Sequence, residues 1–165
     1  MKKLYVIRHA KSSWDNPLQD DFDRPLNKRG ERDAPRMAKR LKEKRITPDL
    51  MLTSPANRAL STCEKIAHIL QYAPGKIKTE RSLYHANEDE ILMVVKKLNE
   101  KHDEVIIIGH NPGLTNFVNK LTDARIDNIP TCGIVACFMD VDSWKKITWD
   151  SGKVDFFDFP KLRED

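Results

Sequence analysis

The chain has 165 residues, a typical size for one domain with a substantial hydrophobic core, so we expect residues 1–165 to form a single domain. Hydrophobic residues make up 39% and charged residues 33%, a balance that favours a folded globular protein and argues against intrinsic disorder. The apolar run at residues 4–7 is too short for a signal peptide, and the longest run, residues 134–139, is far shorter than the roughly 20 residues of a membrane helix. We therefore expect a cytoplasmic protein with no membrane partner.

The charge balance gives little support for a nucleic-acid partner. There are 29 Lys and Arg residues against 25 Asp and Glu, and the resulting charge of +4 is spread along the chain without a block of five like charges. The densest basic segment, residues 28–45, also contains acids and has apolar residues at helical spacing, which indicates a helix with a solvated charged face. A basic face that binds an acidic protein is the alternative.

The cysteines and histidines indicate neither disulfides nor a metal site. Cys63, Cys132 and Cys137 form no CxxC pair, and their odd number favours reduced thiols, which we interpret as core residues. The five histidines show no metal-ligand spacing, so we expect no metal cofactor.

Strand and helix patterns alternate along the chain. In chain order, they predict a strand at 4–7, a helix at 28–45, a strand at 50–53, a helix at 54–70, a strand at 77–83, a helix at 87–98, a strand at 105–108, a helix at 111–121 and a strand at 134–141. Residues 148–165 are expected to add an edge strand or to pack on the sheet. This alternation predicts an α/β fold, a three-layer α/β/α sandwich with a largely parallel central sheet.

Each predicted helix has a capping signal at its start. The signals are Asn27, Ser54 with Pro55 at the first helical position, Asn87 with Glu90 in a capping box, and Asn111 with Pro112 at the first helical position. The acidic segment at residues 15–23 has no glycine at the sixth position of a calcium loop, so we interpret it as a flexible loop near the ligand pocket.

Cationic and imidazole side chains follow three of the predicted strands. The first strand ends abruptly in Arg8 and His9, the second leads through SPAN to Arg58, and the fourth ends at His110. Because ligands bind at the carboxyl ends of parallel strands, we expect these four side chains to share one edge of the sheet.

This set of residues predicts a phosphate site. Guanidinium groups match phosphate oxygens with paired donors, and the two helix starts behind Ser54 and Asn111 offer backbone amides to an anion. Ser12 is a further candidate donor to phosphate, although capping a turn is the plainer interpretation. A neutral histidine among such donors can attack phosphorus, and the arginines can stabilise the transferring group, so the chemistry requires no metal.

The motifs RHAKSSW, SPANRA and GHNPG resemble those of the histidine phosphatase superfamily, and their order and spacing are similar to those of SixA-type phosphohistidine phosphatases. The resemblance implies a phosphoglycerate mutase-like sandwich forming a single histidine phosphatase domain. It also implies that His9 is the phosphorylated nucleophile, that Arg8 and Arg58 hold the phosphoryl group, and that His110 is the second histidine of the pocket.

One departure from the wider family concerns the proton donor. Ester phosphatases and mutases of the superfamily often carry a glutamate two positions after a leucine that follows the third strand, whereas this chain has His85 there and Glu88 slightly further on. Either residue is a possible donor. Imidazole is a much better leaving group than an alkoxide, so this departure fits a phosphohistidine substrate, which needs a dedicated acid less.

Three functions follow from these observations. We expect a metal-independent phosphatase that acts on a protein bearing phosphohistidine. The alternatives are a phosphatase of a small phosphate ester or nucleotide, and a catalytically inactive module that binds phosphate.

Overall fold

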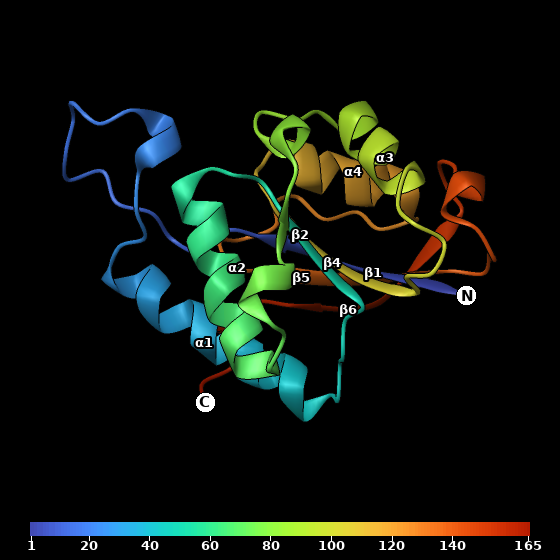
Figure 1. Ribbon diagram of the computed structural model, residues 1–165, viewed down its shortest axis with the longest axis horizontal. Coiled ribbons are helices and arrows are strands. Elements are labelled where there is room, and N and C mark those ends of the chain that lie inside the picture. Colours follow the sequence, from blue (N-terminus) through green and yellow to red (C-terminus); the bar gives the residue numbers. More distant parts are fainter.

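A six-stranded sheet runs through the centre of the molecule, with helices on both of its faces (Figure 1). The computed structural model describes residues 1–165. Its strands are β1 (Lys2–Arg8), β2 (Leu50–Thr53), β3 (Lys78–Thr79), β4 (Glu104–Gly109), β5 (Ile134–Met139) and β6 (Gly152–Asp158). Its α-helices are α1 (Lys28–Glu43), α2 (Asn57–Leu70), α3 (Glu88–Lys96) and α4 (Gly113–Leu121).

The sheet is parallel over four strands and antiparallel at one side. The strands lie in the order β3-β2-β4-β1-β5-β6; the first four are mutually parallel, and β5 and β6 are added in antiparallel orientation. The run from Val105 to Ile108 in β4 is completely buried, as expected for a parallel strand that is covered on both faces. The predicted α/β class with a largely parallel sheet is therefore confirmed.

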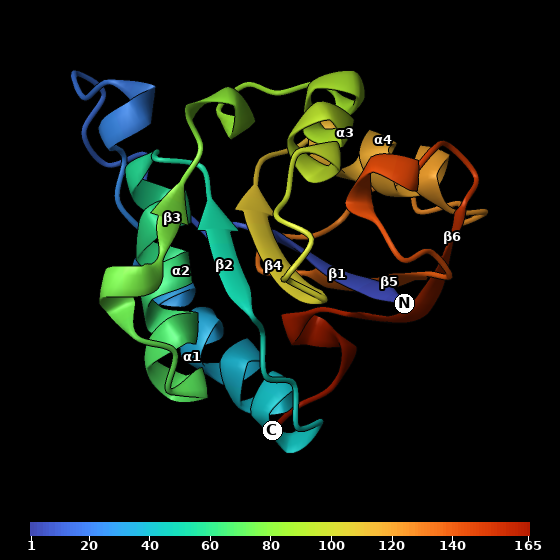
Figure 2. The same cartoon turned by 45° about the vertical axis from the view of Figure 1, so that its right-hand side comes forward.

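Each face of the sheet carries its own hydrophobic core. Successive side chains of a strand point to opposite faces, so Leu4 and Val6 of β1 enter one core while Tyr5 and Ile7 enter the other. The first core packs against α3 and α4, and the second against α1 and α2 (Figure 2). The three layers match the predicted sandwich. No helix of the structure has the length and apolar character needed to span a membrane.

The capping signals of α1 and α3 are confirmed. The Asn27 side chain accepts a hydrogen bond from the amide of Gly30, and Asn87 and Glu90 form the complete capping box. All three cysteines are free and buried, as predicted.

The predicted start of α2 is wrong. The chain bends at Pro55 and Ala56, and Ala56 has non-helical backbone angles, so the helix begins at Asn57 and Pro55 lies before it. Ser54 does not cap the helix because its hydroxyl accepts a hydrogen bond from the Ala56 amide and lies 2.8 Å from His110 Nε2. The sequence pattern therefore marks a turn that positions the Ser54 hydroxyl, rather than a helix cap.

The predicted start of α4 is also too early. Pro112 occupies the capping position and the helix begins at Gly113. The Asn111 carboxamide oxygen still binds the first turn, since it accepts hydrogen bonds from the amide and the hydroxyl of Thr115. Asn111 thus stabilises the helix from one position further out than predicted.

The predicted strand at residues 77–83 forms only in part. Lys78–Thr79 pairs with β2, after which Arg81–Leu83 turns into a 3-10 helix that buries Leu83 in the core. This turn leads into Tyr84 and His85, whose rings stack with a centroid distance of 3.9 Å.

The C-terminal segment adds the predicted edge strand, β6, and is then fixed by Arg40 of α1. The buried Arg40 guanidinium pairs with Asp158 at 3.0 Å and donates hydrogen bonds to the carbonyl groups of Phe159, Pro160 and Arg163. The end of the chain is therefore held against the α1 face of the sheet.

Candidate active site

The four residues predicted at strand ends meet at one edge of the sheet. Arg8 ends β1 and His9 follows it, His110 follows β4, and Arg58 lies in the first turn of α2. These strands and β2 are adjacent and parallel, so their carboxyl ends lie together. The ring centroids of His9 and His110 are 5.2 Å apart, and Arg58 Nε lies 3.4 Å from His9 Nε2.

The environment of His9 keeps its ring neutral and fixes its tautomer. His9 Nδ1 lies 2.8 Å from the carbonyl oxygen of Ala10, which can only accept, so the ring proton resides on Nδ1. Nε2 therefore carries the lone pair, and it faces Arg58. Burial, together with the charges of Arg58 and Arg8, lowers the pKa of His9 to about 4. The ring is therefore neutral at physiological pH.

His110 is a second neutral imidazole. Burial, followed by the proximity of His9 and Arg58, lowers its pKa to about 3. Its Nε2 is held by the hydroxyl of Ser54 at 2.8 Å, and its Nδ1 is buried without a hydrogen-bond partner.

Two of the unsatisfied polar atoms of the molecule belong to this site. Three buried side-chain polar atoms have no hydrogen-bond partner: Arg8 Nε, Asp33 Oδ2 and His110 Nδ1. Buried polar groups normally have partners, so unsatisfied ones at the same edge of the sheet indicate a place for a ligand. A guanidinium N–H is a donor, and the site as a whole is cationic, so the ligand that fits is an anion.

Arg24 is a third arginine at the site that sequence reasoning missed. Its buried side chain donates to the hydroxyl of Ser12 at 2.7 Å, and its guanidinium stacks 3.5 Å from the ring centroid of Trp14. Its positive charge lowers the pKa of His9, as the charges of Arg58 and Arg8 also do. In the sequence, Arg24 stands between an acidic segment and Pro25, and this pattern is too common to indicate a functional residue.

Asp21 was also missed, and it is the most connected acid of the site. Its Oδ2 accepts hydrogen bonds from Arg58 Nη2 at 3.0 Å and from the Tyr84 hydroxyl at 2.7 Å, and its Oδ1 accepts from Arg24 Nε at 3.2 Å. Its backbone carbonyl accepts from Arg58 Nη1 at 2.7 Å. Partial burial opposes ionisation, but the bonds from Tyr84 and Arg58 outweigh it and hold the pKa of the carboxyl well below its ordinary value.

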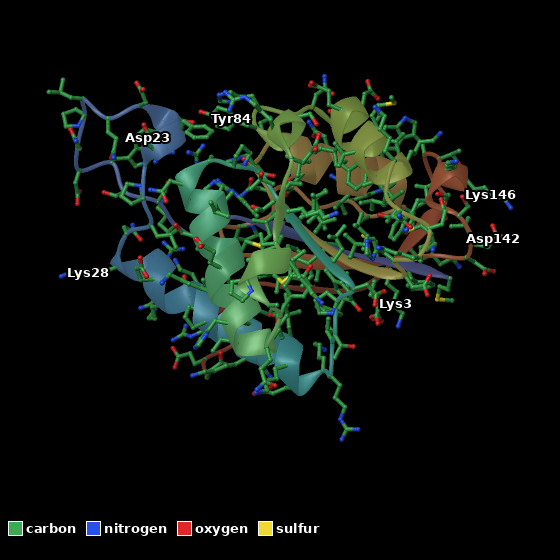
Figure 3. The ribbon with its side chains drawn as sticks, in the orientation of Figure 1. Lys3, Asp23, Lys28, Tyr84, Asp142 and Lys146 are labelled. Carbon is green, nitrogen blue, oxygen red and sulfur yellow. The ribbon has the colours of Figure 1, made fainter.

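The segment that carries Asp21 stands out from the body of the molecule between β1 and α1 (Figure 1). Figure 3 labels Asp23 in its 3-10 turn and Tyr84 beside it, at the same end of the sheet. The rings of Phe22 and Tyr84 meet edge to face with centroids 5.2 Å apart. The acidic loop predicted at residues 15–23 therefore lies beside the site and contributes Asp21 to it.

A cavity of about 330 Å³ opens above Arg58 and His110. Its lining is almost entirely polar: Asp21, Arg58, His85, Ala86, Asn87, Glu88, His110, Asn111, Pro112, Gly113 and Asn116. A larger cavity of about 440 Å³ lies between β2 and α3 and contains none of the predicted site residues. The smaller cavity is lined by His110, and the ring of His9 lies next to His110.

Of the other predicted site residues, three line this cavity and one does not. His85 and Glu88, the candidate proton donors, both line this cavity, as does Asn111. The Asn111 amide nitrogen already donates to Asn128 and to the carbonyl of Ile129. Ser12 is not part of the lining, and its hydroxyl holds Arg24 instead.

The chain was compared with known proteins. The model of the histidine phosphatase superfamily (branch 1) matches residues 4–84. An uncharacterised protein of Mycobacterium tuberculosis is 30% identical over 138 residues, which cover 78% of this chain and 84% of that protein.

Two solved structures share the whole fold. A protein from Agrobacterium tumefaciens classed as the phosphohistidine phosphatase SixA is 25% identical, with a TM-score of 0.78 over 96% of this chain and 98% of that one. The protein histidine phosphatase SixA complexed with tungstate is 22% identical, with a TM-score of 0.83 over 98% of this chain and 99% of that one.

Proposed function

Because the chain belongs to the histidine phosphatase superfamily, in its SixA-type branch, we propose that it removes the phosphoryl group from protein phosphohistidine through a covalent intermediate on His9. The observation that carries this proposal is the arrangement around His9, whose unprotonated Nε2 faces Arg58 beside the unsatisfied donor of Arg8. The similar SixA structure holds tungstate, a tetrahedral oxyanion, which supports an oxyanion site here.

In the first step, the lone pair of His9 Nε2 attacks phosphorus. The bond between phosphorus and the substrate ring nitrogen breaks, and its electron pair stays on that nitrogen. If the other nitrogen of the substrate ring carries a proton, the ring leaves as neutral imidazole, so no proton has to be delivered to the breaking bond. His9 keeps its Nδ1 proton, which the carbonyl of Ala10 continues to accept.

In the second step, water attacks the phosphorus of phosphorylated His9. The bond to Nε2 breaks, its electron pair returns to the ring, and both protons of the water remain on the released phosphate. His9 is then neutral again and ready for another cycle.

The arginines supply the electrostatic stabilisation on which phosphoryl transfer chiefly depends. Arg8 and Arg58 are fixed before the substrate arrives, the first by the carbonyl of Ile129 and the second by Asp21. Their positive charges therefore face the oxygens of the transferring phosphoryl group, and the two side chains do not have to move when the substrate binds. This scheme requires no metal.

A small phosphate ester or nucleotide is the second candidate substrate. It is favoured by the position of His85 and Glu88 in the lining of the cavity, where either could protonate a departing alkoxide. The phosphohistidine proposal has the simpler chemistry, because its leaving group needs no such donor.

The test compares a protein bearing phosphohistidine with a panel of phosphate esters and nucleotides. The wild type should hydrolyse the phosphohistidine protein fastest, His9→Ala should release no phosphate, and His68→Gln, at an exposed position of α2, should act as the wild type. Ester cleavage at an equal or higher rate would contradict the proposed substrate. Binding of phosphate without hydrolysis of any substrate would indicate the third function, a catalytically inactive module that binds phosphate.

A further inference from the structure

The charges at the floor of the site are not all positive. Arg8, Arg24 and Arg58 each contribute a positive charge, whereas Asp21 contributes a negative one in direct contact with two of these arginines. The floor thus has an excess of two positive charges, which a phosphoryl dianion neutralises completely. No positive charge remains for a second anionic group on the same ligand.

The cavity adds only one further formal charge to this floor, the negative charge of Glu88, because Asp21 and Arg58 have already been counted. Asp21 and Glu88 both line it, and Arg58 is the only cationic residue of the lining apart from the histidines. A group attached to the phosphoryl has to occupy this space, next to two carboxylates. A positive charge on that group would be stabilised there and a negative charge would be repelled.

We propose that Asp21 determines specificity: its carboxylate makes the pocket favour a phosphoryl group on a positively charged imidazole ring, whose other nitrogen is protonated, over phosphate esters that carry a second anionic group. The inference rests on the function proposed above and deepens it. A protonated phosphohistidine ring is the form that leaves as neutral imidazole, so the same charge that selects the substrate also selects its reactive form.

The geometry suits this role because Asp21 is held rigidly. The Tyr84 hydroxyl, Arg58 and Arg24 fix both carboxylate oxygens, while the side chain, which lines the cavity, remains 41% exposed. Asp23, two residues along the same turn, carries the same charge and has no side-chain hydrogen bond or ion pair to these arginines. It provides a matched control.

The experiment measures binding of three phosphonates by calorimetry: methylphosphonate, phosphonoacetate, and a methylphosphonate bearing an N-methylated imidazolium ring of permanent charge. None can be hydrolysed, so the readout does not depend on turnover. The wild type should bind the imidazolium compound more tightly than phosphonoacetate. Asp21→Asn, which keeps the shape of the side chain, should reduce that preference about tenfold, an effect expected for a partly buried charge.

The controls separate charge from geometry. Asp21→Glu, which restores the charge, should keep most of the preference, and Asp23→Asn should change it less than about twofold. An equal loss of affinity for all three phosphonates in Asp21→Asn would assign Asp21 to the positioning of Arg58 and overturn the proposal. An unchanged preference would overturn it as well.

Failure of the specificity proposal and failure of the proposed function give different results. If the wild type shows the charge preference and Asp21→Asn loses it, but the wild type hydrolyses no phosphorylated substrate, the function is wrong and the inference about Asp21 stands. If it hydrolyses phosphohistidine while Asp21→Asn keeps the preference, only the inference is wrong.

Discussion

Lowering the pH should destabilise the folded protein through His9. Its pKa in the folded state is about 4, below the ordinary value of 6.5, because the ring is buried beside Arg58 and Arg8. As the pH falls below 6.5, the unfolded chain takes up a proton that the folded protein does not yet bind. The free energy of unfolding therefore decreases with falling pH down to about pH 4.

The size of this effect follows from the two pKa values. At about pH 5, the unfolded histidine is almost fully protonated and the folded one almost fully neutral, which corresponds to a loss of about 2 kcal/mol of stability from this residue. The complete loss, reached below about pH 4, is about 3 kcal/mol. These magnitudes are a large fraction of the stability of a typical domain.

The assay is urea unfolding of the wild type and of His9→Gln, each at neutral pH and near pH 5. Taking the difference between the two proteins cancels the contributions of the titrating groups whose pKa the substitution leaves unchanged. The wild type should lose about 2 kcal/mol more than the variant between the two conditions. Equal losses, or an NMR titration of His9 with a midpoint near its ordinary value, would refute the argument that His9 is held neutral by its surroundings.

Three further predictions concern named contacts. Arg58→Lys, which loses the forked donor, should lower kcat/KM about 10²–10³-fold in steady-state assays, and a loss below tenfold would remove Arg58 from transition-state stabilisation. Arg40→Ala leaves Asp158 buried without its partner and should cost about 3–5 kcal/mol in urea unfolding; a cost below about 1 kcal/mol would show that the C-terminal segment releases readily. Gly113→Ala would drive a methyl group into the carbonyl of Ala86 and should lower the Tm by several degrees, so an unchanged Tm would contradict the close packing of this wall.

The four central residues of the site could be predicted because strand topology alone brings them together. Arg8, His9 and His110 follow apolar strands whose ends must share an edge in a parallel sheet, and Arg58 follows a third such strand by a short turn. The periodicity of the apolar residues sets the fold, and the fold sets the position of these side chains.

Asp21, Arg24 and Tyr84 could not be predicted in the same way. They lie in irregular segments, and their mutual contacts join residues as far as 63 positions apart without any periodic pattern. The misplaced start of α2 has a related cause, since the Ser54 hydroxyl has a partner, His110, that is distant in sequence and competes with helix capping. Sequence propensities describe local structure, whereas these contacts join residues that are far apart in the sequence.

The phosphoenzyme tests the central claim most directly. Wild-type protein is incubated briefly with a substrate carrying a labelled phosphoryl group, quenched with denaturant, and digested to locate the label. We predict label on His9, in a linkage that is stable to base and labile to acid, as a phosphoramidate must be, and none in His9→Ala. A label on another residue, an acid-stable linkage, or turnover that persists in His9→Ala would contradict nucleophilic attack by His9.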